Sequence, residues 1–218
     1  MPDALPSCWP LFALRLRCGP VLLRPVREAD LPHLAAVHPD DHEHDPRPER
    51  WPGQSLQQHR TRLLCQGYWR ALGTWSPTSW CLDLAVEHEG VMVGVQSLEA
   101  EDFPSLRTVD SGSWLVPEVR GRGLGVAMRT AVLALAFDHL GALAAVTSAR
   151  TDNAASLGVS RHLGYRANGV SLTDSPTGLT ELTHLRLTAA DWHGAGRGQQ
   201  VDVEGLEPCR EWFGAPAT

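Results

Sequence analysis

The chain of 218 residues contains no lysine, and all 19 of its basic residues are arginine. The phosphate-binding P-loop pattern G-x-x-x-x-G-K-S/T therefore cannot occur. No apolar run approaches the roughly eighteen residues that a membrane-spanning helix needs, and residues 1–10 lack the basic-then-apolar order of a secretion signal. The five cysteines are scattered and never spaced as C-x-x-C, which argues against a disulfide framework or zinc site. We expect a cytoplasmic protein with no membrane segment.

The charge balance is acidic, with a net charge of −6 at pH 7. Such a chain has no general attraction for nucleic acids or anionic lipids. We expect one domain over residues 1–192, because this length suffices for a single substantial core. Residues 193–218 are expected to form a glycine-rich linker and a short apolar extension. This extension is expected to pack on the domain or on the second subunit of a homodimer.

A glycine-rich turn, Arg120 to Gly125, separates a predicted strand ending at Val116 from a helical pattern over residues 124–139. Three glycines let the backbone approach a ligand closely. The first turn of the following helix offers unpaired N–H groups and a positive dipole end. With Arg120 and Arg122 beside it, this turn is a candidate anion site, and pyrophosphate is the expected anion.

Other interpretations of this turn remain open at this point. The dinucleotide pattern G-x-G-x-x-G fails, because its third glycine would fall on Val126. The same residues are also consistent with a glycine-rich turn that binds no ligand, or with an Arg-Gly segment that contacts nucleic acid. What remains is Arg-x-x-Gly-x-Gly, which resembles the acyl-CoA pyrophosphate loop, Q/R-x-x-G-x-G/A, of the GNAT superfamily of N-acetyltransferases.

A second stretch supports this resemblance. Residues 144–149 read as a buried strand, and Asp152 is the expected N-cap of a short helix that Gly164 ends. Asn153, Ser156, Gly164 and Tyr165 match a second superfamily signature, N-x-x-S/A followed by seven further residues and then G-F/Y. The phrase from Leu22 to Asp30 is similar to the branch that acetylates ribosomal-protein N-termini. Two ordered motifs, one helix and one strand apart, identify the chain as a member of the superfamily.

The resemblance implies an α+β fold, in which a central mixed, mostly antiparallel, splayed sheet of about seven strands is flanked by helices in three layers. Hydrophobic periodicity and turn residues give the individual elements. The expected strands cover residues 12–17, 21–26, 81–87, 91–99, 109–116, 144–149, 170–173 and 181–188. The expected helices cover residues 27–37, 54–72, 124–139 and 153–163, with loops over residues 38–53 and 101–107.

The resemblance also implies that acetyl-CoA is the acyl donor and that backbone amides bind it. Amides of the turn would hold the phosphates, Leu115 and Val116 would hold the thioester carbonyl and pantetheine arm, and Asn153 would bind the pantetheine or its thiol end. The expected donor-binding residues are Leu115, Val116, Arg120, Gly121, Arg122, Gly123, Leu124, Gly125, Val126, Asn153 and Ser156.

Direct attack by an amine on a thioester needs no nucleophilic side chain and no metal. Many members place a tyrosine acid where this chain has Ser160, so Ser156 is the expected proton donor; its alternative role is to cap a helical turn. Asp110 is the favoured general base, with Glu99, Asp174 or a water relay as alternatives.

The loop after residue 37 carries three histidines and four acids over His38 to Asp45. These side chains could hold a metal, but a solvated loop or contact with the acceptor suits them better. Two functions stay open: an acetyl-CoA-dependent N-acetyltransferase acting on a peptide or small-molecule amine, and a catalytically weak CoA-binding regulatory module. Nucleic-acid binding is a third interpretation, against which the acidic charge weighs.

Overall fold

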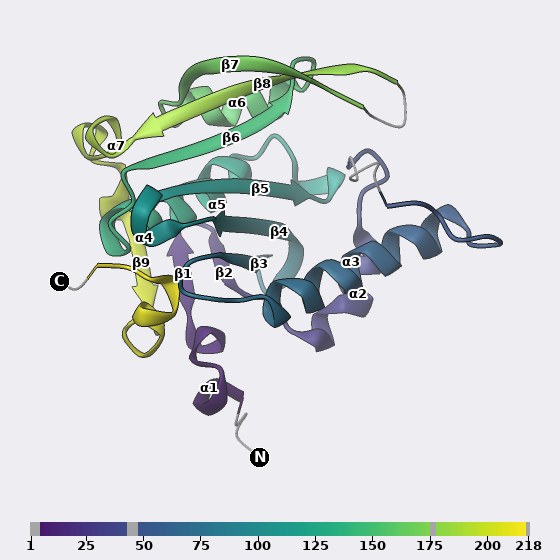
Figure 1. Cartoon of the computed structure of the whole chain (residues 1–218), viewed down its shortest axis with the longest axis horizontal. Helices are drawn as coiled ribbons and strands as arrows, with labels where there is room; N and C mark the ends of the chain where they lie inside the picture. Colours follow the sequence, from purple (N-terminus) through teal and green to yellow (C-terminus); the bar gives the residue numbers. More distant parts are fainter. Residues whose placement is uncertain (1–4, 43–47, 175–177, 217–218) are drawn as a thin grey trace.

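The computed structural model describes residues 5–42, 48–174 and 178–216, and a nine-stranded sheet runs through it in the order β7-β8-β6-β5-β4-β3-β2-β1-β9 (Figure 1). The fold class is as predicted, with nine strands in place of about seven. The strands are β1 Arg15–Cys18, β2 Val21–Pro25, β3 Trp80–His88, β4 Val91–Ala100, β5 Thr108–Leu115, β6 Ala144–Arg150, β7 Arg166–Thr173, β8 Thr180–Thr188 and β9 Val201–Glu204.

Helices cover both faces of this sheet. α2 Leu31–Val37 and α3 Leu56–Gly73 lie on one face, and α5 Leu124–Ala134, with its π-helical continuation η4 Leu135–His139, lies on the other beside α6 Ala154–His162. The remaining helices are α1 Leu5–Cys8, α4 Phe103–Leu106 and α7 Ala189–Ala195, with 3-10 turns η1 Pro10–Ala13, η2 Glu28–Asp30, η3 Pro117–Val119, η5 Arg197–Gln200 and η6 Glu207–Phe213. Within the described ranges, no helix combines the length and apolarity needed to cross a membrane.

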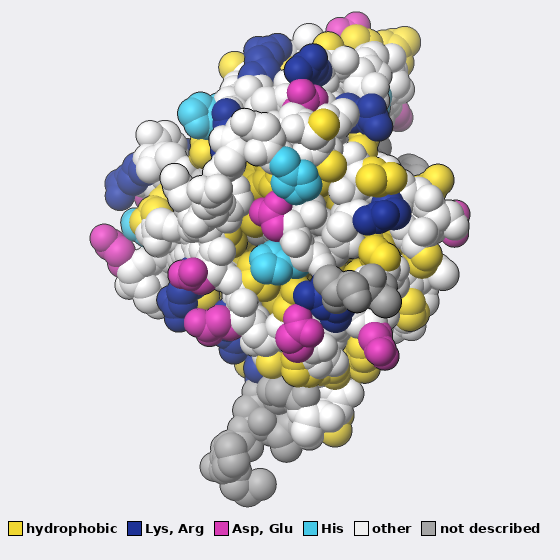
Figure 2. Space-filling model, turned by 90° about the vertical axis from the view of Figure 1, so that its left-hand side faces the viewer, with side chains coloured by type: hydrophobic (Ala, Val, Ile, Leu, Met, Phe, Trp, Pro, Cys, Tyr) yellow, Lys and Arg dark blue, Asp and Glu magenta, His cyan; other side chains and the backbone are white. Residues whose placement is uncertain are grey.

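The side of the molecule that carries α7 and the C-terminal segment is charged but mixed. Figure 2 shows acidic, basic and histidine side chains intermingled on this face, with hydrophobic side chains between them. This face therefore does not present one continuous basic surface of the kind that nucleic acids bind.

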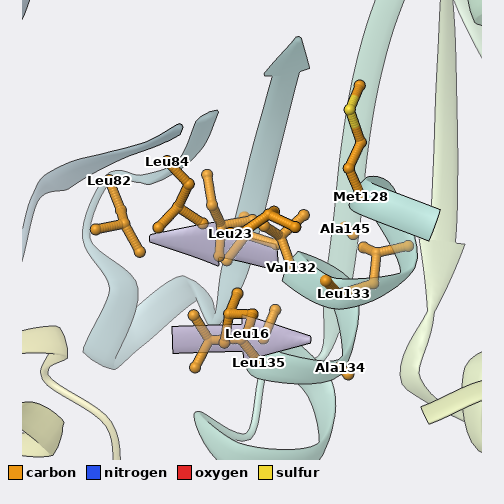
Figure 3. Close-up of a cluster of buried hydrophobic side chains, with 14 of the residues drawn as sticks. Leu16, Leu23, Leu82, Leu84, Met128, Val132, Leu133, Ala134, Leu135 and Ala145 are labelled. Atoms are coloured by element: carbon orange, nitrogen blue, oxygen red, sulfur yellow. The ribbon is translucent and has the colours of Figure 1, made fainter. Parts of the chain in front are cut away.

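The main core lies between α5 and the sheet, where leucines from neighbouring strands meet the apolar side of the helix (Figure 3). Leu16, Leu23 and Leu84 are fully buried against Val132 and Leu135. Each such side chain contributes roughly 1.5–3 kcal/mol through burial. This packing fixes α5, and with it the glycine-rich turn that precedes the helix, against the centre of the sheet.

The two central parallel strands separate along their length. β5 and β6 pair over three positions, from Thr108 with Ala144 to Asp110 with Val146, and then diverge, as Figure 1 shows. On its other edge β5 stays paired with β4 as far as Leu115. The expected splay is thus present between β5 and β6, with its apex at Asp110 and its open end facing the glycine-rich turn.

Three local predictions were wrong. The first strand starts at Arg15 instead of Phe12, because the residues before it form the buried 3-10 turn η1. The predicted loop over residues 101–107 contains the one-turn helix α4. The predicted linker over residues 194–198 is the end of α7 and the start of η5, joined by a left-handed Gly196.

The C-terminal segment joins the sheet. β9 pairs antiparallel with β1, and Phe213 after it is fully buried. The indole N–H groups of Trp75 and Trp80 donate to the carbonyls of Trp212 and Phe213 at 2.9 and 3.1 Å. The extension therefore packs on its own chain and extends the sheet by one strand.

Candidate active site

The glycine-rich turn presents a row of unused backbone donors. Gly121 and Gly123 adopt left-handed conformations, with φ of 74° and 82°. None of the five amides from Gly121 to Gly125 donates to an acceptor in the described part of the chain. Alternating left-handed residues before a helix N-terminus form a concave anion site, and the exposed Arg122 beside it adds positive charge.

Two members of the predicted donor-binding set are engaged elsewhere. The Val126 amide donates to the Gly123 carbonyl at 3.1 Å, as the first bond of α5. The Arg120 guanidinium turns away from the glycines: its Nε donates to the Leu115 carbonyl at 2.9 Å and its terminal nitrogens to Asp41 at 2.5 and 2.8 Å. This bond to Asp41 raises the pKa of Arg120 and lowers that of Asp41. Arg120 thus ties the loop after α2 to the end of β5.

Backbone alternation decides which amides of β5 face the splay. Val116 donates its N–H to Val93 in β4 at 2.9 Å, which corrects its predicted role as a free amide. Because hydrogen-bonding direction alternates along an antiparallel strand, the amides of Leu115 and Ser113 point to the opposite edge, toward β6. The bond from Arg120 to the Leu115 carbonyl agrees with this direction.

The second motif lies at the start of α6. Asn153, not Asp152, is the N-cap: its Oδ1 accepts the Ser156 amide at 3.0 Å, while Asp152 is paired with Arg150 at 2.6 Å. The half-buried Ser156 hydroxyl bonds to no described residue. The Ser160 hydroxyl is buried and donates to the Ser156 carbonyl at 3.1 Å. Of the two hydroxyls, that of Ser156 is therefore available to a ligand.

A cavity of about 400 Å³ lies on the other face of β5, beneath α2 and α3. Trp114, Leu34 and Leu64 give it an apolar lining, and Asp83, Ser97, His38 and Arg60 are among its polar residues. Gly112 and Ser113 of β5 also line it. The cavity therefore reaches the splayed strand from the side opposite α5, and it is lined in part by the loop after α2, which was expected to contact the acceptor.

Three carboxylates and a thiol gather on this face of the sheet. Strand register places Cys81 opposite Glu99, and Glu99 opposite Asp110. Burial raises the pKa of Glu99, and the neighbouring charges of Asp110 and Asp83 raise it further. Burial likewise raises the pKa of Asp110, against which the Ser111 amide and the Arg129 charge act. Glu99 and Asp110, two of the three predicted base candidates, are thus directly adjacent.

Asp83 is the acid that the sequence analysis missed. It faces the cavity, its pKa is raised by burial, and it accepts hydrogen bonds from Ser97 at 2.5 Å and Cys81 at 3.8 Å. It alternates along β3 with the buried Leu82 and Leu84, a pattern that is equally typical of a strand with one face in solvent. Only the packing of α2 and α3 over that face reveals its place. Asp174, the third predicted base candidate, lies outside this carboxylate group, in the turn after β7.

The loop after α2 lies over the cavity. The rings of His38 and His42 lie near Trp114 in tilted orientations, with centroid distances of 4.9 and 6.4 Å, and burial lowers the pKa of His38. Residues 43–47 of the predicted histidine-rich segment lie outside the described residues. Among those that the structure describes, no group of three or more His, Cys, Asp or Glu side chains is arranged so that it could hold a metal ion.

Comparison with known proteins agrees with this geometry. The model of the acetyltransferase (GNAT) domain family matches residues 21–166. RimJ of Mycobacterium smegmatis, solved in complex with a CoA disulfide, is 21% identical, with a TM-score of 0.65 over 86% of this chain and 97% of that one. RimL, a ribosomal L7/L12 α-N-protein acetyltransferase solved with coenzyme A, is 17% identical, with a TM-score of 0.62 over 80% and 96%.

The spermidine/spermine N-acetyltransferase SpeG of Vibrio cholerae has the same fold, with 13% identity and a TM-score of 0.64 over 81% of this chain and 98% of that one. The family match covers two thirds of the chain and includes both motifs. The chain therefore belongs to the GNAT acetyltransferase family of acyl-CoA-dependent enzymes.

Proposed function

We propose that the protein transfers an acyl group from acyl-CoA to the primary amine of a peptide N-terminus or a small molecule. Acetyl-CoA would be the simplest such donor. The observation that carries this proposal is the row of five free amides at the open end of a splayed strand. The cavity on the opposite face of that strand supplies a separate entry for the amine. Donor and acceptor would thus meet at β5 from opposite sides of the sheet.

The chemistry follows from these two entries. The amine nitrogen attacks the thioester carbonyl carbon, a C–N bond forms and the C–S bond breaks, giving an amide and the CoA thiol. The amides of Ser113 and Leu115 would donate to the carbonyl oxygen as it gains negative charge. The Ser156 hydroxyl would donate to the departing sulfur, and a carboxylate on the cavity side would accept the proton that the amine loses.

Amine-dependent release of CoA thiol tests this proposal. We expect acetyl-CoA to be consumed in the presence of an amine from a panel of N-terminal peptides, polyamines and aminoglycosides, with the amide product identified by mass. Tight acetyl-CoA binding without transfer to any amine would instead favour the regulatory module. Tight, steeply salt-dependent RNA or DNA binding would favour the nucleic-acid interpretation, against which the net charge of −6 weighs.

The general base is tested by the pH dependence of transfer. Because the pKa of Asp110 is raised, the acidic limb of the kcat/KM profile should lie above the range of an ordinary carboxyl. Asp110→Asn should remove this limb and lower kcat/KM by roughly 10²–10⁴-fold at neutral pH. Activity should partly recover above about pH 8, where an α-amine is already neutral.

Asp83→Asn is the matched comparison for this experiment, since it removes the same group two strands away on the same face. Loss of the acidic limb in Asp83→Asn, together with an unchanged profile in Asp110→Asn, would transfer the role of base to Asp83. The cytoplasmic location and the homodimer stay predictions, and sedimentation of the purified chain tests the second.

A further inference from the structure

A buried arginine lies beneath the splay. Arg129 of α5 is 4% exposed, on the helix face one turn after Gly125. Within the described residues, its terminal nitrogens form hydrogen bonds with two hydroxyls, at long distances: 3.5 Å to Thr147 of β6 and 3.4 Å to Ser113 of β5. Its buried Nε has no hydrogen-bond partner in the same part of the chain. A guanidinium carries five N–H donors, so most of the bonding capacity of Arg129 is unused.

No carboxylate of the described residues forms an ion pair with this guanidinium. Arg129 interacts electrostatically with Asp110, but the Asp110 side chain points to the opposite face of the sheet, beside Glu99. An unpaired buried charge is expensive, and buried arginines are almost always paired. The position of Arg129 therefore indicates that an anion from outside the chain completes its contacts.

The surroundings of Arg129 are polar and buried, and they lie at the apex of the splay. The Thr147 hydroxyl donates to the Ser111 carbonyl at 3.0 Å, which bridges β5 and β6 where their ladder ends. The buried Ser111 hydroxyl has no hydrogen-bond partner among the described residues, and the phenol of Tyr165 lies beside Ser111 and Arg129. Three hydroxyl-bearing side chains and the guanidinium thus converge on one buried point.

The positions of the free amides and of the apex along β5 determine which portion of a bound donor would reach Arg129. The five free amides lie beyond the C-terminal end of β5, and the apex lies at Asp110. A donor whose pyrophosphate occupies those amides runs its pantetheine arm along β5 toward the apex. If its thioester carbonyl accepts from Ser113 or Leu115, the acyl chain is the part that points at Arg129.

We propose that the acyl donor is a CoA thioester whose acyl chain ends in a carboxylate, and that Arg129 binds this carboxylate. This inference rests on the proposed acyl transfer and specifies its donor. An acetyl group has no anion to offer, whereas a three- to five-carbon dicarboxylic chain does. The carboxylate itself is unchanged: the amine attacks the thioester carbon, the C–S bond breaks, and the product is a half-amide. The modified amine then ends in a negative charge instead of a positive one.

Donor kinetics test the proposal. Malonyl-, succinyl- and glutaryl-CoA would be compared with acetyl-CoA and with butyryl-CoA, in which a methyl group replaces the carboxylate of succinyl-CoA. We expect the best dicarboxylic donor to exceed butyryl-CoA in kcat/KM by about 10- to 100-fold, the range for hydrogen bonds to a charged group. Arg129→Met should remove this preference while acetyl transfer changes little, and Arg129→Lys should retain part of it.

Stability and a charge control separate binding from structure. Arg129→Met is expected to melt no lower than wild type without ligand, because an apolar side chain replaces an unpaired buried charge. The exposed Arg161→Met on α6 removes equal charge and should keep the donor preference. An equal loss of kcat/KM with every donor in Arg129→Met would overturn the proposal. So would a wild type whose kcat/KM with butyryl-CoA equals its kcat/KM with all three dicarboxylic donors.

The outcome for the proposed function is read separately. If no donor is transferred to any amine, the transfer proposal fails, and thermal shifts then decide the role of Arg129. A larger shift with succinyl-CoA than with butyryl-CoA, lost in Arg129→Met, would still support an anionic acyl site. Equal shifts with the two donors would refute it.

Discussion

Gly123→Val is expected to abolish acyl-CoA binding while leaving the chain folded. Gly123 lies at φ 82° with its amide among the five free donors. A valine would place its branched side chain over these amides and disfavour the left-handed backbone that aligns them. At one hundred times its dissociation constant, a ligand stabilises the wild type by about 2.7 kcal/mol. For a chain of this size that corresponds to a rise in Tm of about 5–10 °C, which the variant should lack.

Gly90→Val supplies the control. Gly90 has nearly the same φ, 77°, in the turn between β3 and β4, and an added Cβ meets no atom within 4 Å at either glycine. Both variants therefore bear a similar backbone strain, and only Gly123→Val lies in the proposed phosphate site. A ligand-induced shift of equal size in the two variants would contradict the assignment of this loop.

Ser156→Ala is expected to lower turnover by roughly 10²–10⁴-fold, the usual range for one acid–base group. The affinity for acyl-CoA should stay nearly intact, because the contact matters mainly as charge develops on the sulfur. The half-buried Ser156 hydroxyl bonds to none of the residues that the structure describes, and the cap at this helix comes from Asn153 instead. Single-turnover kinetics together with direct binding measurements separate the two effects.

Ser160→Ala is the matched variant, four residues along the same helix. Its hydroxyl is buried and bonded to the Ser156 carbonyl, so its removal should leave turnover almost unchanged. The opposite pattern, with Ser160→Ala inactive and Ser156→Ala normal, would mean that Ser160 is the proton donor. Ser160 stands where many family members have a tyrosine. If neither variant changes turnover, solvent protonates the departing thiolate.

Local chemistry explains which features the sequence predicts. The turn from Arg120 to Gly125 needs only glycines, a strand before it and a helix after it. Its six residues are therefore enough to predict a turn with free backbone amides. The cap at Asn153 is one residue away from the predicted Asp152, because Arg150 captures that carboxylate in an ion pair. Such competition between two good caps is decided by a third side chain.

Features that depend on packing between distant elements were not predictable in the same way. Arg129 directly follows Met128 in the helical pattern, and nothing local shows that its side chain is buried against β5 and β6. Arg120 was assigned to phosphate, but Asp41, far away in the sequence, draws its guanidinium to the acceptor side. In both cases the tertiary structure brings together partners that no spacing rule relates.

The pairing of β9 with β1 has a consequence for synthesis of the protein. β1 is complete by residue 18, whereas β9 begins at residue 201. At roughly 5–20 residues per second, a ribosome needs on the order of 10–40 s to span that interval. During this time the outer edge of β1 is an open strand edge, the kind that attracts a second nascent chain. Arg15 and Arg17 put two positive charges on that edge, which keeps neighbouring nascent chains apart until the last residues emerge.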